Sequence, residues 1–246
     1  EKMGIDVLIE FPFTKETSGI EAEDFVKDVL VDGLGAKAIV SGSDFHFGHE
    51  RRGNVDMLIE LGKTMGFTAD VCQKLQIEAP IYENGRFTGR KEFKDVSSTL
   101  IREAIRRGDM EFATAMLGAP FAVSGEVVHG RQLGRKLGMP TANVMPPMHK
   151  IMPPNGVYSS RTIVGDYIYH SVTNIGFNPT VAENNSKRME TYVYDFSGSL
   201  YGKEIEVQLF RFERPEMKFD GVDALKNQIH KDKAGTMEYF GTHPDL

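Results

Sequence analysis

The sequence predicts an α/β domain with a parallel sheet over residues 1–117, followed by an antiparallel sandwich or barrel with a C-terminal helix over residues 118–246. In the first part, short apolar runs alternate with helical patterns, which is typical of a parallel sheet with crossover helices. In the second part, strand-like runs follow one another without helices between them. The change occurs at Gly118-Ala119-Pro120, where we place the domain boundary.

Periodicity places the elements of the first part. Residues 20–34 and 55–65 carry apolar side chains at helical spacing, whereas short apolar runs beside turn signals are typical of buried strands. Ser97-Ser98-Thr99 provides an N-cap serine for a helix at 100–107, and Asp109 caps the next one. The expected strands are 7–11, 38–40 and 67–71, and the expected helices are 20–34, 55–65, 100–107 and 110–117.

The second part is punctuated by Gly, Pro, Asn and Asp, which favour turns between short strands. The apolar alternation of residues 205–209 slips in phase at Phe210, which predicts a β-bulge. A last apolar stripe predicts a helix over 222–240 that covers the barrel, with Asp220 as its N-cap. The expected strands are 121–128, 157–164, 167–175, 191–196 and 205–212.

Composition limits the classes of function. Of the 246 residues, 40% are hydrophobic and 26% are charged, which is typical of a globular protein. The net charge of −6 provides no general basic field, so we expect no nucleic-acid partner. No apolar run approaches the roughly 18 residues of a membrane span, so we expect no membrane partner. The single Cys72 excludes an internal disulfide and fits a reducing cytoplasm, while the sequence leaves a homo-oligomer undecided.

The stretch 129–143, HGRQLGRKLGMPTAN, combines glycines with positive charge and hard oxygen ligands. Glycines allow backbone N–H groups to turn toward an anion, and basic side chains add charge for phosphate oxygens. It is not a P-loop, because Gly130 and Gly134 are separated by three residues rather than four. On residue types alone, a nucleotide-phosphate loop and an ordinary glycine-rich connection on a barrel rim are equally well supported. The basic residues between the glycines are Arg131, Arg135 and Lys136.

The full string G-x-x-x-G-x-x-x-G-x-P-T-A-N resembles the signature of riboflavin kinases. Later motifs match that family in the right order over about half of the chain, and the family fold is a six-stranded antiparallel barrel. These motifs are Gly156-Val157-Tyr158, Gly176-x-Asn178-Pro179-Thr180, Met189-Glu190-Thr191-Tyr192, Asp195-Phe196, Leu200-Tyr201-Gly202 and Arg214 to Phe219.

The resemblance implies transfer of the γ-phosphoryl group of ATP to the 5′-hydroxyl of riboflavin, which gives FMN. Glu190 would take the proton from the attacking hydroxyl, although the residue alone reads as a surface glutamate. Arg214 would lie near the flavin, with a surface ion pair as the alternative. Mg²⁺ would bind Thr141 and Asn143. The residues implied to bind ATP are Gly130, Gly134, Arg135, Lys136, Gly138, Pro140, Thr141 and Asn143.

The first part resembles the later portion of the FMN adenylyltransferase, a Rossmann-like nucleotidyltransferase that many bacteria fuse to this kinase. Gly42 to Gly48 is similar to its G-x-D-F-x-F-G segment, and Val96 to Arg102 to its I-S-S-T-x-I-R motif. A helix N-terminus that carries hydroxyls and an arginine suits nucleotide phosphates, while a simple capped helix is the alternative. The residues implied to contact nucleotide or flavin are Asp44, Phe45, Ser98, Thr99 and Arg102.

The adenylyltransferase family also uses a His-x-Gly-His motif for ATP phosphates. His46-Phe-Gly-His49 matches it literally, but it overlaps the D-F-x-F-G segment, so we interpret it as a coincidence. A metal pair is disfavoured as well, because no third ligand follows at a suitable spacing. We therefore expect an incomplete adenylyltransferase portion that lacks its N-terminal segment, with kinase activity and little or no adenylyl transfer in this chain, and both activities in a longer parent.

Two other functions compete with the enzyme. A sensor would hold flavin or nucleotide without turnover, and a generic nucleotide-binding protein would bind no flavin. The presence of Glu190 together with Thr141 and Asn143 favours the enzyme, because a sensor could lose any of them. Incubation with riboflavin and Mg·ATP separates the three by the products FMN and FAD.

Overall fold

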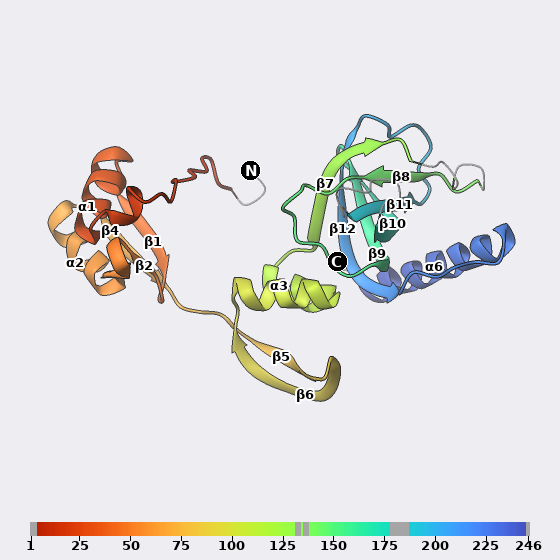
Figure 1. The fold of residues 1–246 in the computed structure, drawn as a ribbon, viewed down its shortest axis with the longest axis horizontal. Helices are drawn as coiled ribbons and strands as arrows, with labels where there is room; N and C mark the ends of the chain where they lie inside the picture. Colours follow the sequence, from red (N-terminus) through yellow and green to blue (C-terminus); the bar gives the residue numbers. More distant parts are fainter. Residues whose placement is uncertain (1–3, 131–133, 135–137, 178–186, 245–246) are drawn as a thin grey trace. The chain divides into compact units, whose positions relative to one another are not determined.

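A computed structural model describes residues 4–130, 134, 138–177 and 187–244 of the protein. The chain forms two compact units, Glu1–Gln76 and Ile77–Leu246 (Figure 1). Among the described residues, no helix is both long and apolar enough to span a bilayer.

The first unit is built on a β-α-β arrangement. Strand β1 (Ala38–Gly42) pairs in parallel with β4 (Thr68–Cys72), and helix α2 (Val55–Met65) connects them. Asn54 caps α2 by accepting a hydrogen bond from the Met57 amide, which satisfies one free N–H of the first turn. The core beneath α2 consists of Ala22, Val26, Phe47, Leu58 and Phe67.

The remaining elements of this unit are short. Helix α1 (Ala22–Asp24) continues into a π-helical segment η2 (Phe25–Gly33), so the helix expected over 20–34 is confirmed in position but has wider turns. The strand expected at 7–11 is wrong, because this segment finds no strand partner in the described part of the chain and its apolar side chains are exposed. The other elements are η1 (Thr17–Gly19), β2 (His46–Phe47), η3 (His49–Arg51) and β3 (Gly53–Asn54).

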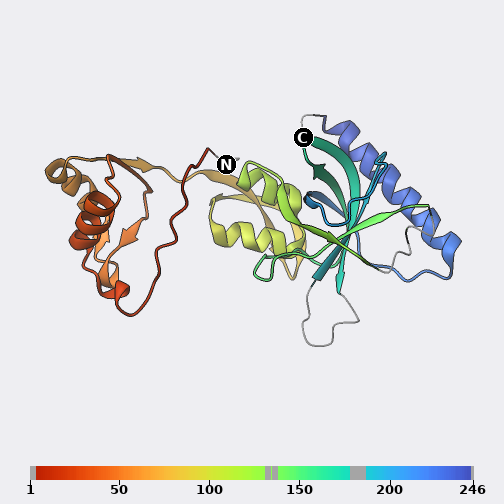
Figure 2. The ribbon, with the colours of Figure 1, turned by 90° about the horizontal axis from the view of Figure 1, so that it is seen from above.

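The second unit contains a closed antiparallel barrel with strand order β10-β11-β8-β7-β12-β9, which confirms the barrel class and its six strands (Figure 2). Helix α6 (Val222–Thr242) lies along the outside of this barrel, and Tyr239 and Phe240 pack against Phe210. The strands are β7 (Phe121–Val128), β8 (Thr141–Val144), β9 (Gly156–Val164), β10 (Tyr167–Phe177), β11 (Lys187–Val193) and β12 (Glu204–Arg214).

The barrel interior has an apolar part and a hydroxyl part. Alternate residues of each strand point inward, so Ala142 and Val144 of β8 join the apolar core, as does Met189 of β11. Five fully buried hydroxyl side chains form a chain of hydrogen bonds across β9, β10 and β11, with O–O distances of 2.8–2.9 Å. They belong to Ser160, Thr162, Ser171, Thr173 and Thr191.

Two helices close one end of the barrel. Ser97 and Asp109 accept hydrogen bonds from the amides of Leu100 and Phe112, which confirms both predicted caps. Helices α3 (Ser98–Arg107) and α4 (Met110–Leu117) contribute Ala104, Met110 and Ala113 to the same core as the barrel strands. The compact units therefore divide at residue 76, whereas the change from helices to strands falls at 118, which remains a proposal for the domain boundary.

Several predicted bounds need correction in this unit. The hairpin of β5 (Gln76–Glu83) and β6 (Arg86–Asp95) was not predicted, because charged residues obscure its alternation. The strand expected at 191–196 is β11, which starts and ends earlier. The bulge is confirmed by a register shift between Leu209 and Arg211. Asp220 is not the N-cap of α6: Gly221 occupies that position and no side chain caps the helix.

Candidate functional site

The Thr-Ala-Asn part of the Pro-Thr-Ala-Asn motif lies on strand β8 (Thr141–Val144), directly after Pro140. Because side chains alternate along a strand, Thr141 and Asn143 face outward while Ala142 and Val144 enter the core. A strand places two side chains more rigidly than a loop does. The two predicted metal ligands therefore project from the same face of the barrel wall.

The strand register then brings the predicted residues together. Glu190 of β11 lies directly opposite Asn143 of β8 on one side and Asn174 of β10 on the other. Asn174 lies opposite Val157, which lies opposite Arg214 of β12. Directly opposed residues point to the same face, and neighbouring strands are about 4.8 Å apart. Asn143, Glu190 and Arg214 thus share one row that crosses five strands on the outer face.

Asn143 is buried but incompletely satisfied. The residue is only 4% exposed, and its side-chain Oδ1 has no hydrogen-bond partner among the described residues. A Cβ atom at Gly130 would lie 2.5 Å from this side chain, so glycine is required for their close approach. A buried oxygen without a partner is costly unless a ligand completes it. Asn143 is therefore suited to hold a cation.

The rest of the glycine-rich segment is described in part. Gly134 lies against the Met139 carbonyl, where a Cβ atom would come within 2.4 Å of the oxygen, and Gly138 has a φ of 77°. Crowding therefore requires glycine at position 134, whereas the left-handed backbone favours glycine at position 138. The predicted ATP-binding residues Arg135 and Lys136 lie outside the described residues, as do Arg131 and Asn178 to Thr180.

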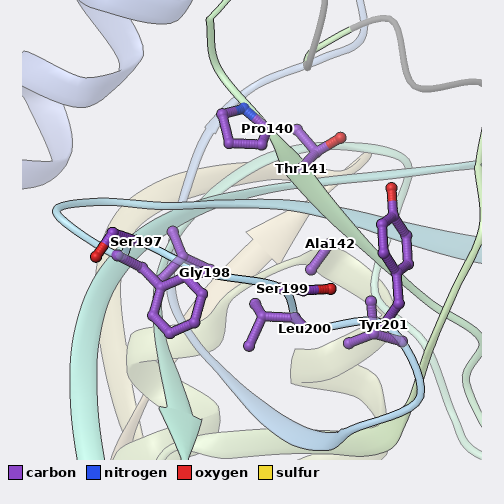
Figure 3. Close-up of a pocket in the computed structure, with 11 residues that line it drawn as sticks. Pro140, Thr141, Ala142, Ser197, Gly198, Ser199, Leu200 and Tyr201 are labelled. Atoms are coloured by element: carbon purple, nitrogen blue, oxygen red, sulfur yellow. The ribbon is translucent and has the colours of Figure 1, made fainter.

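Thr141 lies between two cavities in the barrel wall. The first has a volume of about 420 Å³ and is lined by β8 and by the segment between β11 and β12 (Figure 3). Tyr201, at the end of that segment, stacks on His129 with 4.0 Å between ring centroids. The lining residues labelled in Figure 3 are Pro140, Thr141, Ala142, Ser197, Gly198, Ser199, Leu200 and Tyr201.

The second cavity, of about 200 Å³, lies between the outer row and helix α6. Thr141, Glu190 and Asn174 provide its polar lining on the barrel side, next to Tyr192. Most of the remaining wall is apolar, which suits a flat aromatic ligand with a polar end. The apolar side chains are Met139, Val157, Val172, Met217, Phe219, Leu225 and Ile229.

Arg214 lines the second cavity but is already paired. Its Nε and Nη2 atoms donate to the two carboxylate oxygens of Asp232 at 2.9 and 2.7 Å, and Nη1 donates to the Pro215 carbonyl. Asp232 also accepts from Gln228. The side chains of Arg214 and Asp232 are only 17% and 7% exposed, so this pair is largely shielded from water. The surface ion pair considered as an alternative is thus a partly buried one that ties α6 to β12.

Asp232 and Tyr201 line the two cavities but were not selected as site residues from the sequence. Asp232 is one of several charged residues on a helix, and only its contact with Arg214 distinguishes it. The pattern of polar residues along α6 does not indicate that Asp232 pairs with Arg214. Tyr201 belongs to the matched Leu-Tyr-Gly motif, which was the available signal.

The adenylyltransferase-like residues fall in both units. In the first, Phe45 stacks on Phe47, and a phenylalanine-rich cavity of about 210 Å³ also includes Phe11, Phe13 and Phe25. Asp44 pairs with Lys74 at 3.1 Å, and this hydrogen bond and charge lower the pKa of the Asp44 carboxyl.

Ser98, Thr99 and Arg102 belong to helix α3 of the second unit. Arg102 Nη1 donates to the Ser98 hydroxyl at 3.1 Å, one turn apart on that helix. Hydroxyls at a helix start, with an arginine beside them, retain the character of an anion site. The simple capped helix accounts equally well for the Ser97 contact.

His46 and His49 contact backbone carbonyls. The Nδ1 atoms of His46 and His49 lie 2.9 Å from the Asp44 oxygen and 3.1 Å from the Ser18 oxygen. In the described part of the chain, no group of three His, Cys, Asp or Glu side chains is arranged to hold a metal ion. A metal in this protein would therefore rely on other oxygens, such as those of Asn143, together with its substrate.

Comparison with known proteins gives a consistent assignment. Residues 117–240 match the family model of riboflavin kinase, and residues 1–82 match that of FAD synthetase. The bifunctional riboflavin kinase/FMN adenylyltransferase of Pseudomonas fluorescens is 35% identical to this chain, over 94% of this chain and 70% of the relative. The protein of the same name from Escherichia coli K12 is also 35% identical, over 97% of this chain and 71% of the relative. A Streptococcus pneumoniae structure titled as a macrolide-efflux protein aligns with a TM-score of 0.74 and 28% identity, over 92% of this chain and 67% of the other.

Proposed function

The chain belongs to the family of bifunctional riboflavin kinase/FMN adenylyltransferases, and from this premise we propose how its barrel binds the two substrates of the kinase reaction. The enzyme transfers the γ-phosphoryl group of ATP to the 5′-hydroxyl of riboflavin, which gives FMN and ADP. We place ATP in the first cavity and riboflavin in the second. The observation that carries this placement is that Thr141 lines both cavities, where the two substrates would meet.

The size of the first cavity and the linings of both cavities support this assignment. The first cavity, at about 420 Å³, is of the size that a nucleotide occupies, and Ser197 and Ser199 provide hydroxyls. The second has apolar walls for the flavin ring, with Glu190 and Asn174 at its polar side for the ribityl chain. The first cavity also has apolar side chains, among them Val193, Phe196 and Leu200, but Glu190 lines only the second, so the reverse placement would separate the base from the riboflavin hydroxyl.

Mg²⁺ is part of the proposal, and the residues present fit it. Mg²⁺ prefers a few protein oxygens together with phosphate oxygens, and Asn143 has a buried oxygen without a described partner. Thr141 projects from the same face of β8, two residues earlier. When bound, Mg²⁺ neutralises charge on the β- and γ-phosphates. Thr141 and Asn143 would then fix the phosphates beside Glu190.

Glu190 acts on the nucleophile. Its position opposite Asn143 puts a carboxylate next to the phosphate site, and it lines the cavity assigned to riboflavin. The carboxylate accepts the hydrogen bond of the 5′-hydroxyl and takes its proton as the P–O bond forms, while ADP leaves with the electron pair of the broken bond. General-base assistance of this kind is worth about 10²–10⁴ in rate.

Arg214 serves the flavin site through Asp232 rather than with a free guanidinium. Replacing Asp232 with Asn should raise the KM for riboflavin about tenfold and lower the melting temperature, because removing one partner of a shielded pair leaves the other charge unpaired and loosens α6. Steady-state kinetics with varied riboflavin and thermal unfolding measure both effects. Glu238→Gln, an exposed carboxylate on the same helix, is the matched control. An unchanged riboflavin KM would remove α6 from the flavin site.

We also propose a limited role for the adenylyltransferase-like part. Its phenylalanine-rich cavity suits a flavin ring, whereas His46 and His49 are engaged with backbone carbonyls. These contacts use only Nδ1 of each ring, but the His-x-Gly-His match overlaps the D-F-x-F-G segment of Gly42 to Gly48, whereas the phosphate-binding histidines of the family precede that segment. We therefore propose that this chain forms little or no FAD, while Asp44, Phe45, Ser98, Thr99 and Arg102 retain contacts to nucleotide or flavin.

One incubation tests both statements. With riboflavin, ATP and MgCl₂, separation of the flavins by chromatography should show FMN accumulating and FAD absent or formed at least about a hundredfold more slowly, since phosphate positioning is worth that much in rate. The Escherichia coli K12 relative serves as the positive control for FAD. No FMN would overturn the kinase assignment, and FAD at the rate of the relative would overturn the proposal for His46 and His49.

The relatives are enzymes, so nothing in the comparisons supports a sensor without turnover. Small-molecule substrates agree with the family, and a homo-oligomer stays undecided. A reducing cytoplasm remains the proposed location because the single exposed cysteine, Cys72, forms no disulfide within the chain.

A further inference from the structure

We infer that Arg188 is a positioning residue for Glu190, an inference that rests on the kinase reaction proposed above. Arg188 and Glu190 are two residues apart on β11, so their side chains lie on the same face of the barrel wall. The Nη2 atom of Arg188 donates a hydrogen bond to Oε1 of Glu190. This contact engages one oxygen of the carboxylate and leaves Oε2 for the substrate hydroxyl.

The pair is more shielded than an ordinary surface ion pair. The Arg188 side chain is 16% exposed and that of Glu190 is 35% exposed. Fully exposed pairs contribute little because water and salt screen them, but screening weakens as the charges become buried. A hydrogen bond in which both partners are charged is also shorter and more directional than a neutral one. Arg188 can therefore hold the Glu190 carboxylate in one orientation.

The neighbouring strand fixes the other side of this arrangement. Arg188 lies opposite Gly176 of β10, and a Cβ atom at Gly176 would lie 2.4 Å from the Glu216 carboxylate. Glu216 itself accepts hydrogen bonds of 3.3 Å from Asn155 and Asn174. Because Asn174 is the strand neighbour of Glu190, a bonded amide–carboxylate group flanks the base on β10 while Arg188 holds it along β11.

The chemistry explains why a cation beside the base is tolerable. In phosphoryl transfer the transition state is loose and catalysis depends mainly on positioning and charge neutralisation. Placing the hydroxyl in line with the γ-phosphorus is therefore worth more than basicity, and a displacement of about 1 Å can cost 10²-fold in rate. Arg188 acts through Glu190 by keeping that placement.

Arg188→Met and Arg188→Lys test the inference in the full chain. We expect Arg188→Met to lower kcat about tenfold, with the KM values of riboflavin and ATP within about twofold of wild type, because binding contacts remain and only the orientation of the base is lost. Arg188→Lys should restore most of the kcat, since it retains a cationic hydrogen-bond donor. Lys187→Met is the matched control, because Lys187 is the adjacent cation of β11 and bonds the Pro153 carbonyl instead.

Three results would overturn the inference. An Arg188→Met enzyme with wild-type kcat would show that the ion pair has no part in turnover. A raised KM for ATP with unchanged kcat would show that Arg188 binds phosphate instead. An equal loss in Arg188→Met and Arg188→Lys, at wild-type melting temperatures, would show that the site needs arginine for another reason. If Arg188→Met does not fold, Arg188→Gln gives the same comparison. Failure of the wild-type chain to form FMN would instead count against the proposed function.

Discussion

Replacing Glu190 with Gln should lower FMN formation by a factor of about 10²–10⁴ and leave ATP affinity close to that of the wild type. Glutamine has the shape of glutamate and keeps an oxygen for hydrogen bonding, but it cannot take the proton of the attacking hydroxyl. Glu190 lies on the outer face of β11, away from the apolar core, so the barrel should fold unchanged. The loss should therefore appear in kcat rather than in binding.

Two measurements separate turnover from binding. Chromatographic detection of FMN gives kcat, and titration calorimetry with Mg·ATP gives the nucleotide affinity. Glu204→Gln is the control, because Glu204 is an exposed carboxylate on strand β12 that lines neither the first nor the second cavity. Wild-type turnover in Glu190→Gln would sink the assignment of the base, and a collapse of ATP affinity would show that Glu190 acts on the nucleotide instead.

Replacing Asn143 with Ala should lower kcat at least about a hundredfold and raise the Mg²⁺ concentration needed for half-maximal rate. The change removes the Oδ1 oxygen that has no described partner, and the loss of one preorganised electrostatic group at a reacting centre typically costs about 10²–10³ in rate. The cavity left behind is small, because asparagine and alanine differ by one amide group. Stability should therefore change less than activity.

Initial rates over a range of MgCl₂ concentrations, at fixed riboflavin and ATP, test this expectation. Asn227→Ala, which removes an exposed asparagine from α6, controls for the substitution itself. If Asn143→Ala shows the Mg²⁺ dependence of the wild type and only a lower melting temperature, Asn143 has a structural role and the metal binds elsewhere.

Periodicity predicted the elements that carry their own pattern. The expected bounds of α2 and β7 agree with the structure, because each has a clear apolar stripe and turn residues at its ends. β8 was not recognised as a strand, since its four residues were interpreted through their ligand chemistry. Residues 7–11 have the composition of a strand but form none, because a strand exists only with a partner and composition does not supply one.

The residues of the candidate site also fall into those that the sequence predicted and those that only the structure revealed. Motif spacing selected Glu190, Thr141 and Asn143, and the strand register brings these three residues to one face. Motif spacing could not show that the Arg214 guanidinium is paired with Asp232, because that contact joins residues of strand β12 and helix α6. Motif spacing could not select Arg188 either. The role proposed for Arg188 depends on the face of β11 that its side chain occupies and on Gly176, the small residue opposite it.

The buried hydroxyl groups of the barrel favour one register of strands β9, β10 and β11 during folding. Ser160 lies opposite Ser171, and Thr173 opposite Thr191, so their hydrogen bonds form only when β9, β10 and β11 are aligned as they are here. A strand displaced by two residues would keep its apolar face inward but bury hydroxyls without partners, at a cost of about 1–3 kcal/mol each. The same alignment decides which β11 residue faces Asn143. The buried hydroxyl groups inside the barrel thus help to select the strand register that places Glu190 opposite Asn143.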